Sequence, residues 1–293
     1  MPMSFAQRLM QRIDRVGGAA CVGLDPVAER LPNGLTGRQD AEKLEAFCLG
    51  VVDACADFAA CFKPQWACFE RYGAAGIAAL ERVTQAARAT GALVIADAKR
   101  GDIGVSSHHY AEALFAGGAE SDAATASPYL GGEALAPLLD AVQQRGKGLF
   151  VLVRTSNPGA GEFQGLKLHD GRTVCEAIAD GVASWGAASV DDSGYSGVGA
   201  VVGATAPEEA AALRARMPQQ VFLVPGFGAQ GGSVETVTPC FDAQGRGAVV
   251  NASRSVLYAF ENQAGPWQAA VRDVAERLRD QVAEASALAQ RRS

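Results

Sequence analysis

The chain has 293 residues, 48% of them hydrophobic and 20% charged, and a formal net charge of −6 at pH 7. This is the composition of a globular protein with a large core, and the acidic balance argues against nucleic acid as a partner, because no basic excess is present to replace phosphate counterions. No apolar run approaches the length of a membrane span, so no membrane partner is expected.

Residues 1–16 predict an amphipathic helix, over about 3–16, because Phe5, Leu9, Ile13 and Val16 recur at helical spacing. The same residues lack the continuous apolar core of a signal peptide. The seven cysteines form no CxxC pair, which is typical of reduced thiols in a protein that is not secreted, and zinc binding is not expected. We therefore expect a cytoplasmic protein whose first helix packs on the fold.

Short apolar runs alternate with longer segments of helical period along the rest of the chain. The predicted strands are 19–24, 59–62, 92–96, 122–126, 148–153, 197–202, 221–224 and 248–250. Helices are predicted at about 40–57, 73–90, 105–116, 131–145, 171–188, 207–216, 230–238 and 266–289. Continuous apolar strands are typical of a parallel sheet covered on both faces. Without a linker or a shift in composition, these units predict one domain, 1–293, folded as a (β/α)8 TIM barrel; a doubly wound open sheet is the alternative.

Polar residues follow the predicted strands at their carboxyl ends, where the active sites of barrel enzymes lie. They are Asp25, Lys63, Asp97, Lys99, Ser127, Thr155, Thr205 and Arg254. The opposite ends of the strands offer little comparable chemistry. This agreement between separate strands favours a functional site over a set of unrelated surface residues.

The most informative of these strand ends is the run from Asp97 to Asp102, which also contains Lys99. Residues two apart on a strand point to the same side, so Asp97 and Lys99 are expected to share a face. An isolated Asp-x-Lys is more often a surface ion pair. At the mouth of a barrel, however, two carboxylates around one ammonium would hold it charged and repel a further anion.

Lys63 ends another apolar strand, where an unpaired charge is costly to bury. We therefore expect Lys63 to pair with Asp97 or Asp25, although Asp25 precedes a proline and is equally typical of a turn. A Schiff-base role for Lys63 or Lys99, as in barrel aldolases, is the competing chemistry. Neighbouring acids oppose it because they keep a lysine protonated, so a proton donor fits better.

Residues 225–232 contain a GxGxxG pattern, but in the seventh β-α unit rather than the first, where a dinucleotide site begins. A flexible phosphate-binding loop is the more economical interpretation. Arg254 follows the eighth strand, and the loops after strands seven and eight are the usual phosphate site of this fold. The loop that begins at Thr155-Ser156-Asn157 is either a plain surface connection or a reader of a heterocycle edge. Three histidines give little support to a metal site or a Ser-His-Asp triad.

These residues together resemble the orotidine 5′-phosphate decarboxylase family over nearly the whole chain. The resemblance rests on Asp25, Lys63, the run 97–102, the loop 155–159, the glycine-rich segment 225–232 and the segment 253–255. The segment 62–65 and the long insertions resemble the bacterial subgroup with larger chains. The resemblance implies decarboxylation of orotidine 5′-monophosphate (OMP) to UMP in pyrimidine biosynthesis, with no metal or organic cofactor, by a homodimer with shared active sites.

The resemblance also implies a role for each charged residue. Lys99 would give a proton to C6 of the pyrimidine as CO2 departs, and Asp97 and Asp102 would face the substrate carboxylate, with Lys63 completing an alternating array. Asp102 would come from the neighbouring subunit, together with Ile103 and Ser106.

The remaining implied contacts bind the rest of the nucleotide. Asp25 and Lys63 would bind ribose hydroxyls and Ser156 the pyrimidine edge. Gln230 and Arg254, with the adjacent Ser253, would hold the phosphate. Many members of the family have Thr at the position of Ser106 and Gly at that of Ser253.

Two alternatives stay open. A related sugar-phosphate decarboxylase or aldolase shares the DxKxxD pattern but uses a divalent ion, which needs a further carboxylate beside Asp97; Glu70 and Glu133 are the nearest candidates. The other alternative is a catalytically silent barrel that only binds a phosphate ligand.

Overall fold

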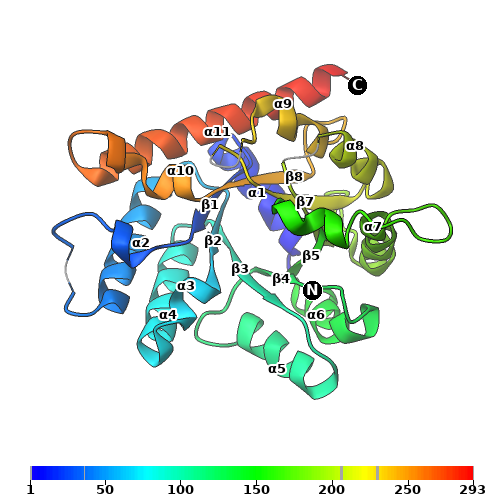
Figure 1. Ribbon diagram of the computed structural model, residues 1–293, viewed down its shortest axis with the longest axis horizontal. Helices are drawn as coiled ribbons and strands as arrows, with labels where there is room; N and C mark the ends of the chain where they lie inside the picture. Colours follow the sequence, from blue (N-terminus) through cyan, green and yellow to red (C-terminus); the bar gives the residue numbers. More distant parts are fainter. Residues whose placement is uncertain (1, 36, 205–206, 229–230, 293) are drawn as a thin grey trace.

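A closed barrel of parallel strands forms the centre of the protein in the computed structural model (Figure 1). The structure describes residues 1–293 except 1, 36, 205–206, 229–230 and 293. Within these residues the strands are β1 (Ala20–Leu24), β2 (Cys61–Pro64), β3 (Leu93–Arg100), β4 (Ala123–Ala126), β5 (Gly148–Arg154), β6 (Ser196–Val202), β7 (Gln220–Pro225) and β8 (Ala248–Ala252). Each strand pairs in parallel with the next, and β8 pairs with β1. The predicted TIM barrel is confirmed, and the open doubly wound sheet is excluded.

The strands β2 and β3 continue further than the sequence predicts, and both continuations carry charged residues. β2 ends at Pro64 and so includes Lys63. β3 ends at Arg100 and so includes Asp97 and Lys99. Because the carboxyl ends of parallel strands meet at one mouth of the barrel, these continuations bring the charges of two adjacent strands together.

Helices surround the barrel (Figure 1). In the described residues they are α1 (Phe5–Val16), α2 (Asp40–Cys55), α3 (Trp66–Glu70), α4 (Gly73–Ala89), α5 (Gly104–Phe115), α6 (Gly132–Arg145), α7 (Val174–Gly186), α8 (Pro207–Arg216), α9 (Val234–Val237), α10 (Arg254–Leu257) and α11 (Trp267–Arg292). Short 3-10 turns are η1 (Ala28–Arg30), η2 (Pro158–Glu162), η3 (Ala187–Ser189), η4 (Thr238–Cys240) and η5 (Ala259–Asn262). None of these described helices combines the length and the apolar character that crossing a membrane requires.

The prediction of a helix over 230–238 is wrong for most of its length. Only Val234–Val237 is α-helical, and the 3-10 turn η4 follows it. Gly228 and Gly231 have φ of +73° and +90°, which a right-handed helix does not allow. At the other end Pro239 has no N–H to continue the helical hydrogen bonds. The segment after β7 is therefore mostly loop.

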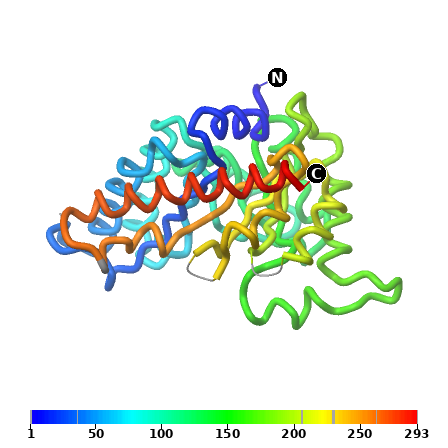
Figure 2. Tube along the Cα trace, turned by 90° about the horizontal axis from the view of Figure 1, so that it is seen from above, coloured from blue at the N-terminus to red at the C-terminus, as the bar shows by residue number. Residues whose placement is uncertain are grey.

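Helix α1 closes the amino-terminal end of the barrel. The Phe5 ring meets the Phe150 ring of β5 edge to face, with ring centroids 5.7 Å apart, and Leu9 is fully buried. Ser4 caps the helix by accepting a hydrogen bond from the Gln7 N–H at 3.0 Å. Figure 2 shows α1 at one end of the molecule and the long loop after β5 at the opposite end. The carboxyl ends of the strands thus open away from α1.

Candidate active site

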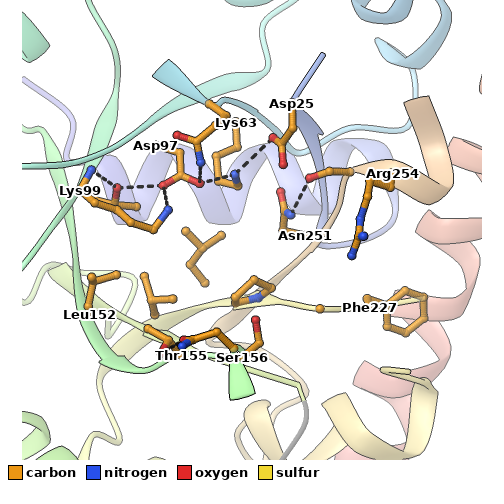
Figure 3. Close-up of a pocket in the computed structure, with 18 residues that line it drawn as sticks. Asp25, Lys63, Asp97, Lys99, Leu152, Thr155, Ser156, Phe227, Asn251 and Arg254 are labelled. Atoms are coloured by element: carbon orange, nitrogen blue, oxygen red, sulfur yellow. Dashed lines mark hydrogen bonds and ion pairs between the residues drawn. The ribbon is translucent and has the colours of Figure 1, made fainter. Parts of the chain in front are cut away.

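A cavity of about 400 Å³ lies at the carboxyl ends of the strands (Figure 3). Seven predicted site residues line it: Asp25, Lys63, Asp97, Lys99, Ser156, Ser253 and Arg254. The other polar lining residues are Gln65, Thr125, Thr155, Asn157 and Asn251, and the apolar wall consists mainly of Leu152, Val201, Leu223, Pro225 and Phe227. Lys99 and Arg254 lie at opposite ends of the row of labelled side chains (Figure 3). The cavity therefore offers one cation at each end.

Asp97 lies between two lysines. Its Oδ2 accepts a hydrogen bond from Lys63 Nζ at 2.5 Å, and its Oδ1 accepts one from Lys99 Nζ, also at 2.5 Å. The Asp97 and Lys63 side chains are buried, whereas 46% of the Lys99 side chain is exposed. Lys99 is therefore the lysine of this pair that can reach a ligand in the cavity.

Two neutral donors, which the sequence analysis did not assign, complete the contacts of Asp97. Gln65 Nε2 donates to Oδ2 at 3.2 Å, and Thr125 Oγ1 donates to Oδ1 at 3.1 Å. Thr125 of β4, rather than Ser127 after the strand, lines the cavity. Each carboxylate oxygen thus receives one charged and one neutral donor, and this fixes the orientation of the carboxylate.

The buried charges keep their ionised forms because they are paired. Burial alone would raise the pKa of Asp97, but the charges of Lys63 and Lys99 and their hydrogen bonds lower it well below its ordinary value of 3.8. Burial alone would lower the pKa of Lys63, but the carboxylates of Asp25 and Asp97 raise it above its ordinary value of 10.5. Asp25 Oδ1 lies 3.9 Å from Lys63 Nζ. The predicted pairing of Lys63 thus involves both acids, with Asp97 the closer.

The lowered pKa of Asp97 predicts how stability depends on pH. The carboxylate contributes stability that is fully present above pH 3.8, its ordinary pKa, and that is lost as the pH falls below this value. Asp97→Asn should lower the free energy of unfolding at pH 7 by about 3–5 kcal/mol, because it removes the closest partner of a buried cation. Below pH 4 the difference should shrink by about 1.4 kcal/mol per pH unit. Urea denaturation of both proteins between pH 7 and 3 measures this difference, and a constant gap would contradict the prediction.

Lys99 has an unusual backbone conformation. Its φ is +48°, and among the described non-glycine residues no other has a positive φ. This left-handed conformation costs about 1–2 kcal/mol for a residue with a side chain. The register between β3 and β4 shifts at the same point, between Ala96 and Arg100. Asp97 and Lys99 do meet, as predicted, but an irregular strand rather than regular alternation brings them together.

The opposite end of the cavity is formed by the loops after β7 and β8. Arg254 is exposed at the start of α10, and its guanidinium has no hydrogen-bond or ion-pair partner among the described residues. Ser253 Oγ accepts a hydrogen bond from Asn251 Nδ2 at 3.3 Å. Gln230, predicted to act with Arg254, lies outside the described residues, as does Thr205. This end therefore presents to an anion a cation that no other described residue pairs.

Asp102, Ile103 and Ser106 do not line the cavity of their own chain. Asp102 Oδ1 accepts a hydrogen bond from the Ile103 N–H at 2.8 Å. Ile103 and Ser106 are exposed at the start of α5. The structure thus places these three predicted residues outside the cavity that Lys99 of the same chain lines.

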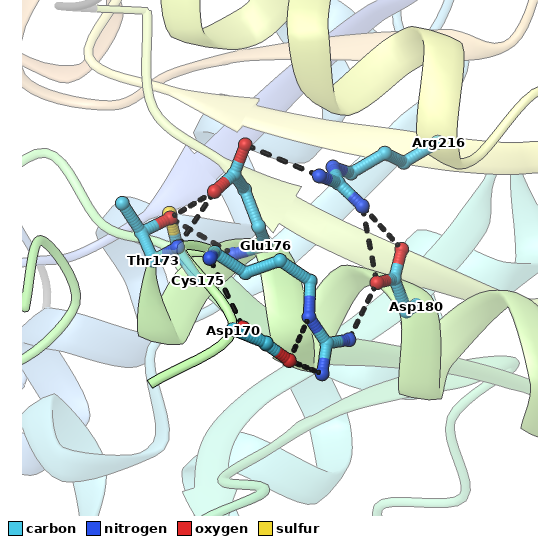
Figure 4. Close-up of polar contacts among 7 residues, drawn as sticks. Asp170, Thr173, Cys175, Glu176, Asp180 and Arg216 are labelled. Carbon is cyan, nitrogen blue, oxygen red and sulfur yellow. Dashed lines mark hydrogen bonds and ion pairs between the residues drawn. The ribbon is translucent and has the colours of Figure 1, made fainter. Parts of the chain in front are cut away.

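The long loop after β5 begins at the cavity and is tied down at its far end. Thr155, beside Ser156, exchanges two hydrogen bonds with Gln164, one from the Thr155 N–H at 2.9 Å and one to Thr155 Oγ1 at 2.8 Å. At the far end Arg172 binds Asp170 and Asp180. Arg216 of α8 continues this network to Asp180 and Glu176 of α7, as Figure 4 shows. Both ends of the loop that carries Ser156 are therefore anchored.

The carboxylates suggested for a metal ion are not at the cavity. Glu70 binds Arg100, and Glu133 is exposed on α6; neither lines the cavity. Among the described residues, no group of three or more His, Cys, Asp or Glu side chains is arranged to hold a metal ion.

Known proteins resemble this chain over almost its whole length. Residues 19–268 match the sequence profile of the family described as "Orotidine 5'-phosphate decarboxylase / HUMPS family". A relative from Rhodopirellula baltica, named orotidine 5′-phosphate decarboxylase, is 42% identical over 96% of this chain and 99% of its own length. A relative of the same name from Deinococcus radiodurans is 41% identical, over 96% of this chain and 98% of its own length. The solved structure of Leishmania donovani OMP decarboxylase has a TM-score of 0.77 and 35% identity, covering 94% of this chain and 98% of that one.

Proposed function

Because the chain belongs to the orotidine 5′-phosphate decarboxylase / HUMPS family, its general activity is the decarboxylation of OMP in pyrimidine biosynthesis, and we propose that it does so without a metal ion, with Lys99 as the proton donor. The observation that carries this mechanism is the position of Lys99. Its ammonium is held by Asp97 at 2.5 Å and is also exposed to the cavity. The products would be UMP and CO2.

The chemistry demands a cation at the reacting carbon. Loss of CO2 leaves an electron pair on C6 of the pyrimidine, and no cofactor delocalises it. An ammonium held in advance near C6 stabilises this charge and then supplies the proton. Its attachment to Asp97 orients it, and the apolar wall of Leu152, Val201 and Leu223 strengthens the interaction by excluding water. The Asp97 carboxylate also repels the substrate carboxylate as CO2 departs.

The remaining polar groups match the rest of the nucleotide. Asp25 Oδ1 is buried and has no hydrogen-bond partner among the described residues, so a ribose hydroxyl would supply the missing donor. The guanidinium of Arg254, which has no partner among the described residues, suits the phosphate, with Ser253 beside it and Gln230 as a further phosphate contact. Ser156 lies on the anchored loop and would bind the pyrimidine edge. Binding energy from the phosphate would thus organise a reacting centre at the far end of the cavity.

The active site would be shared between two subunits. Asp102, Ile103 and Ser106 would extend from one subunit into the cavity of the other and complete the acids around Lys99. Two large apolar side chains at the start of α5 support this, because Ile103 is 58% exposed and Val105, two residues further along the chain, is 74% exposed. Apolar side chains exposed close together are typical of a protein interface. The homodimer is therefore part of the proposal.

The cysteines favour a reducing compartment. All seven are free thiols, and six of them are buried. Disulfides are rare in the cytosol and common outside it. We therefore place the activity in the cytoplasm as part of the proposal.

The decisive experiment incubates purified protein with OMP in the presence of EDTA and follows the ultraviolet absorbance change as UMP forms. We expect full turnover, because no step of the proposed mechanism uses a metal ion. A reaction that is absent with EDTA and appears with added Mg²⁺ would favour the metal-dependent sugar-phosphate enzyme. Tight UMP binding without turnover under either condition would favour the silent phosphate-binding barrel.

A further inference from the structure

Thr125 connects the two residues at the centre of the cavity through one hydroxyl group. Its Oγ1 accepts a hydrogen bond from the Lys99 N–H at 3.0 Å and donates one to Asp97 Oδ1 at 3.1 Å. The Ala96 carbonyl oxygen is a more distant acceptor, 3.5 Å from Thr125 Oγ1. The hydroxyl has a single hydrogen, which is therefore directed to the nearer and charged acceptor, Asp97 Oδ1. The side chain is buried in β4, so water does not compete for these bonds.

The bond to Lys99 lies where the regular pairing of β3 and β4 is interrupted. β3 and β4 pair regularly up to Ala96 and Ala124, and the pairing resumes at Arg100 and Ala126. Between these points β3 has three residues where β4 has only Thr125. In a regular parallel ladder the N–H of a strand residue bonds to a carbonyl of its neighbour. Here the Thr125 side chain is the acceptor for the N–H of Lys99, the residue whose φ is +48°.

We propose that Thr125 is a positioning residue for the reaction: its hydroxyl holds the left-handed backbone of Lys99 and the carboxylate of Asp97 in one arrangement, so that the Lys99 ammonium points at the reacting carbon. This role rests on the proposed function of Lys99. Thr125 acts through its two partners and needs no contact with the substrate. Its loss should lower kcat, while KM stays nearly constant because the phosphate and ribose contacts lie elsewhere.

Gln65 offers a matched comparison. It also donates a neutral hydrogen bond to Asp97, at 3.2 Å, but no hydrogen bond joins its side chain to Lys99 among the described residues. Gln65→Met therefore removes one bond to Asp97 and leaves the Lys99 backbone held. Thr125→Val removes the hydroxyl at nearly constant size, and Thr125→Ser keeps it.

The experiment measures kcat and KM for OMP in the wild type and these three variants, with hydrogen exchange of the Lys99 amide followed by NMR. Thr125→Val should lower kcat by about 10- to 100-fold, as loss of a hydrogen bond to a charged group does, with KM changed less than about 3-fold. Thr125→Ser should retain kcat within about 3-fold, and Gln65→Met should lose less than Thr125→Val. The Lys99 amide should exchange faster in Thr125→Val and not in Gln65→Met.

Several outcomes would overturn this role. They are a wild-type kcat in Thr125→Val, an equal loss in Thr125→Val and Thr125→Ser, and a loss in Gln65→Met as large as in Thr125→Val. If Thr125→Val does not fold, Thr125→Ala against Thr125→Ser gives the same comparison. Wild-type protein that does not turn over OMP contradicts the proposed function, and the Lys99 amide exchange still decides whether Thr125 holds the backbone.

Discussion

Lys99→Ala should abolish decarboxylation, lowering kcat/KM for OMP by about 10⁴-fold or more while UMP still binds. General acid catalysis contributes about 10²- to 10⁴-fold, and removal of one stabilising donor costs a further 10²- to 10³-fold or so. Neither of the other two cations among the described residues that line the cavity can replace it. Lys63 is buried and bound to Asp97, and Arg254 lies at the other end of the cavity (Figure 3).

The test combines steady-state assays with calorimetric titration of UMP. Binding of UMP should remain within about 10-fold of the wild type, since the phosphate contacts are unchanged and most of the binding energy is remote from the reacting carbon. Lys43→Ala, on α2 and outside the cavity, is the matched control for the loss of a lysine and should retain activity. Near-normal turnover in Lys99→Ala would remove Lys99 from the mechanism.

The sequence was sufficient to predict the barrel and most of the cavity, because both follow from local patterns. Continuous apolar runs mark buried parallel strands, and the fold then brings their carboxyl ends to one mouth. Asp25, Lys63, Asp97 and Lys99 each follow such a run, so the sequence places all four at this mouth of the barrel.

The contacts that hold this array could not be predicted in the same way. Thr125 belongs to an ordinary strand sequence, and its contact with Lys99 depends on the register shift between β3 and β4. Gln65 follows β2 and bonds to Asp97 on the adjacent strand β3. The positive φ of Lys99 could not be predicted from the sequence either, because the residues that favour the left-handed region are Gly, Asn and Asp. The incorrect helix at 230–238 is different, since its glycines and Pro239 were visible signals of a loop.

A mixture of two inactive variants, Asp97→Ala and Asp102→Ala, tests the shared site most directly. When the two chains are combined and allowed to exchange subunits, the mixture should regain about one quarter of the wild-type activity. Asp102 does not line the cavity of its own chain, whereas Asp97 does. In a two-fold dimer with sites built from both chains, each mixed dimer has one site with both acids and one site with neither. Random exchange makes about half of the dimers mixed, and half of their sites are complete.

The control for this experiment is a mixture of Asp97→Ala with Lys99→Ala. Both residues line the same cavity, so every site in a mixed dimer lacks one of them and no activity should return. If Asp102 acts within its own chain, the first mixture must behave like the second, because each chain then lacks one residue of its own site. Recovery in the first mixture alone, with subunit exchange shown by mass spectrometry of differently tagged chains, therefore identifies Asp102 as the acid that crosses the interface.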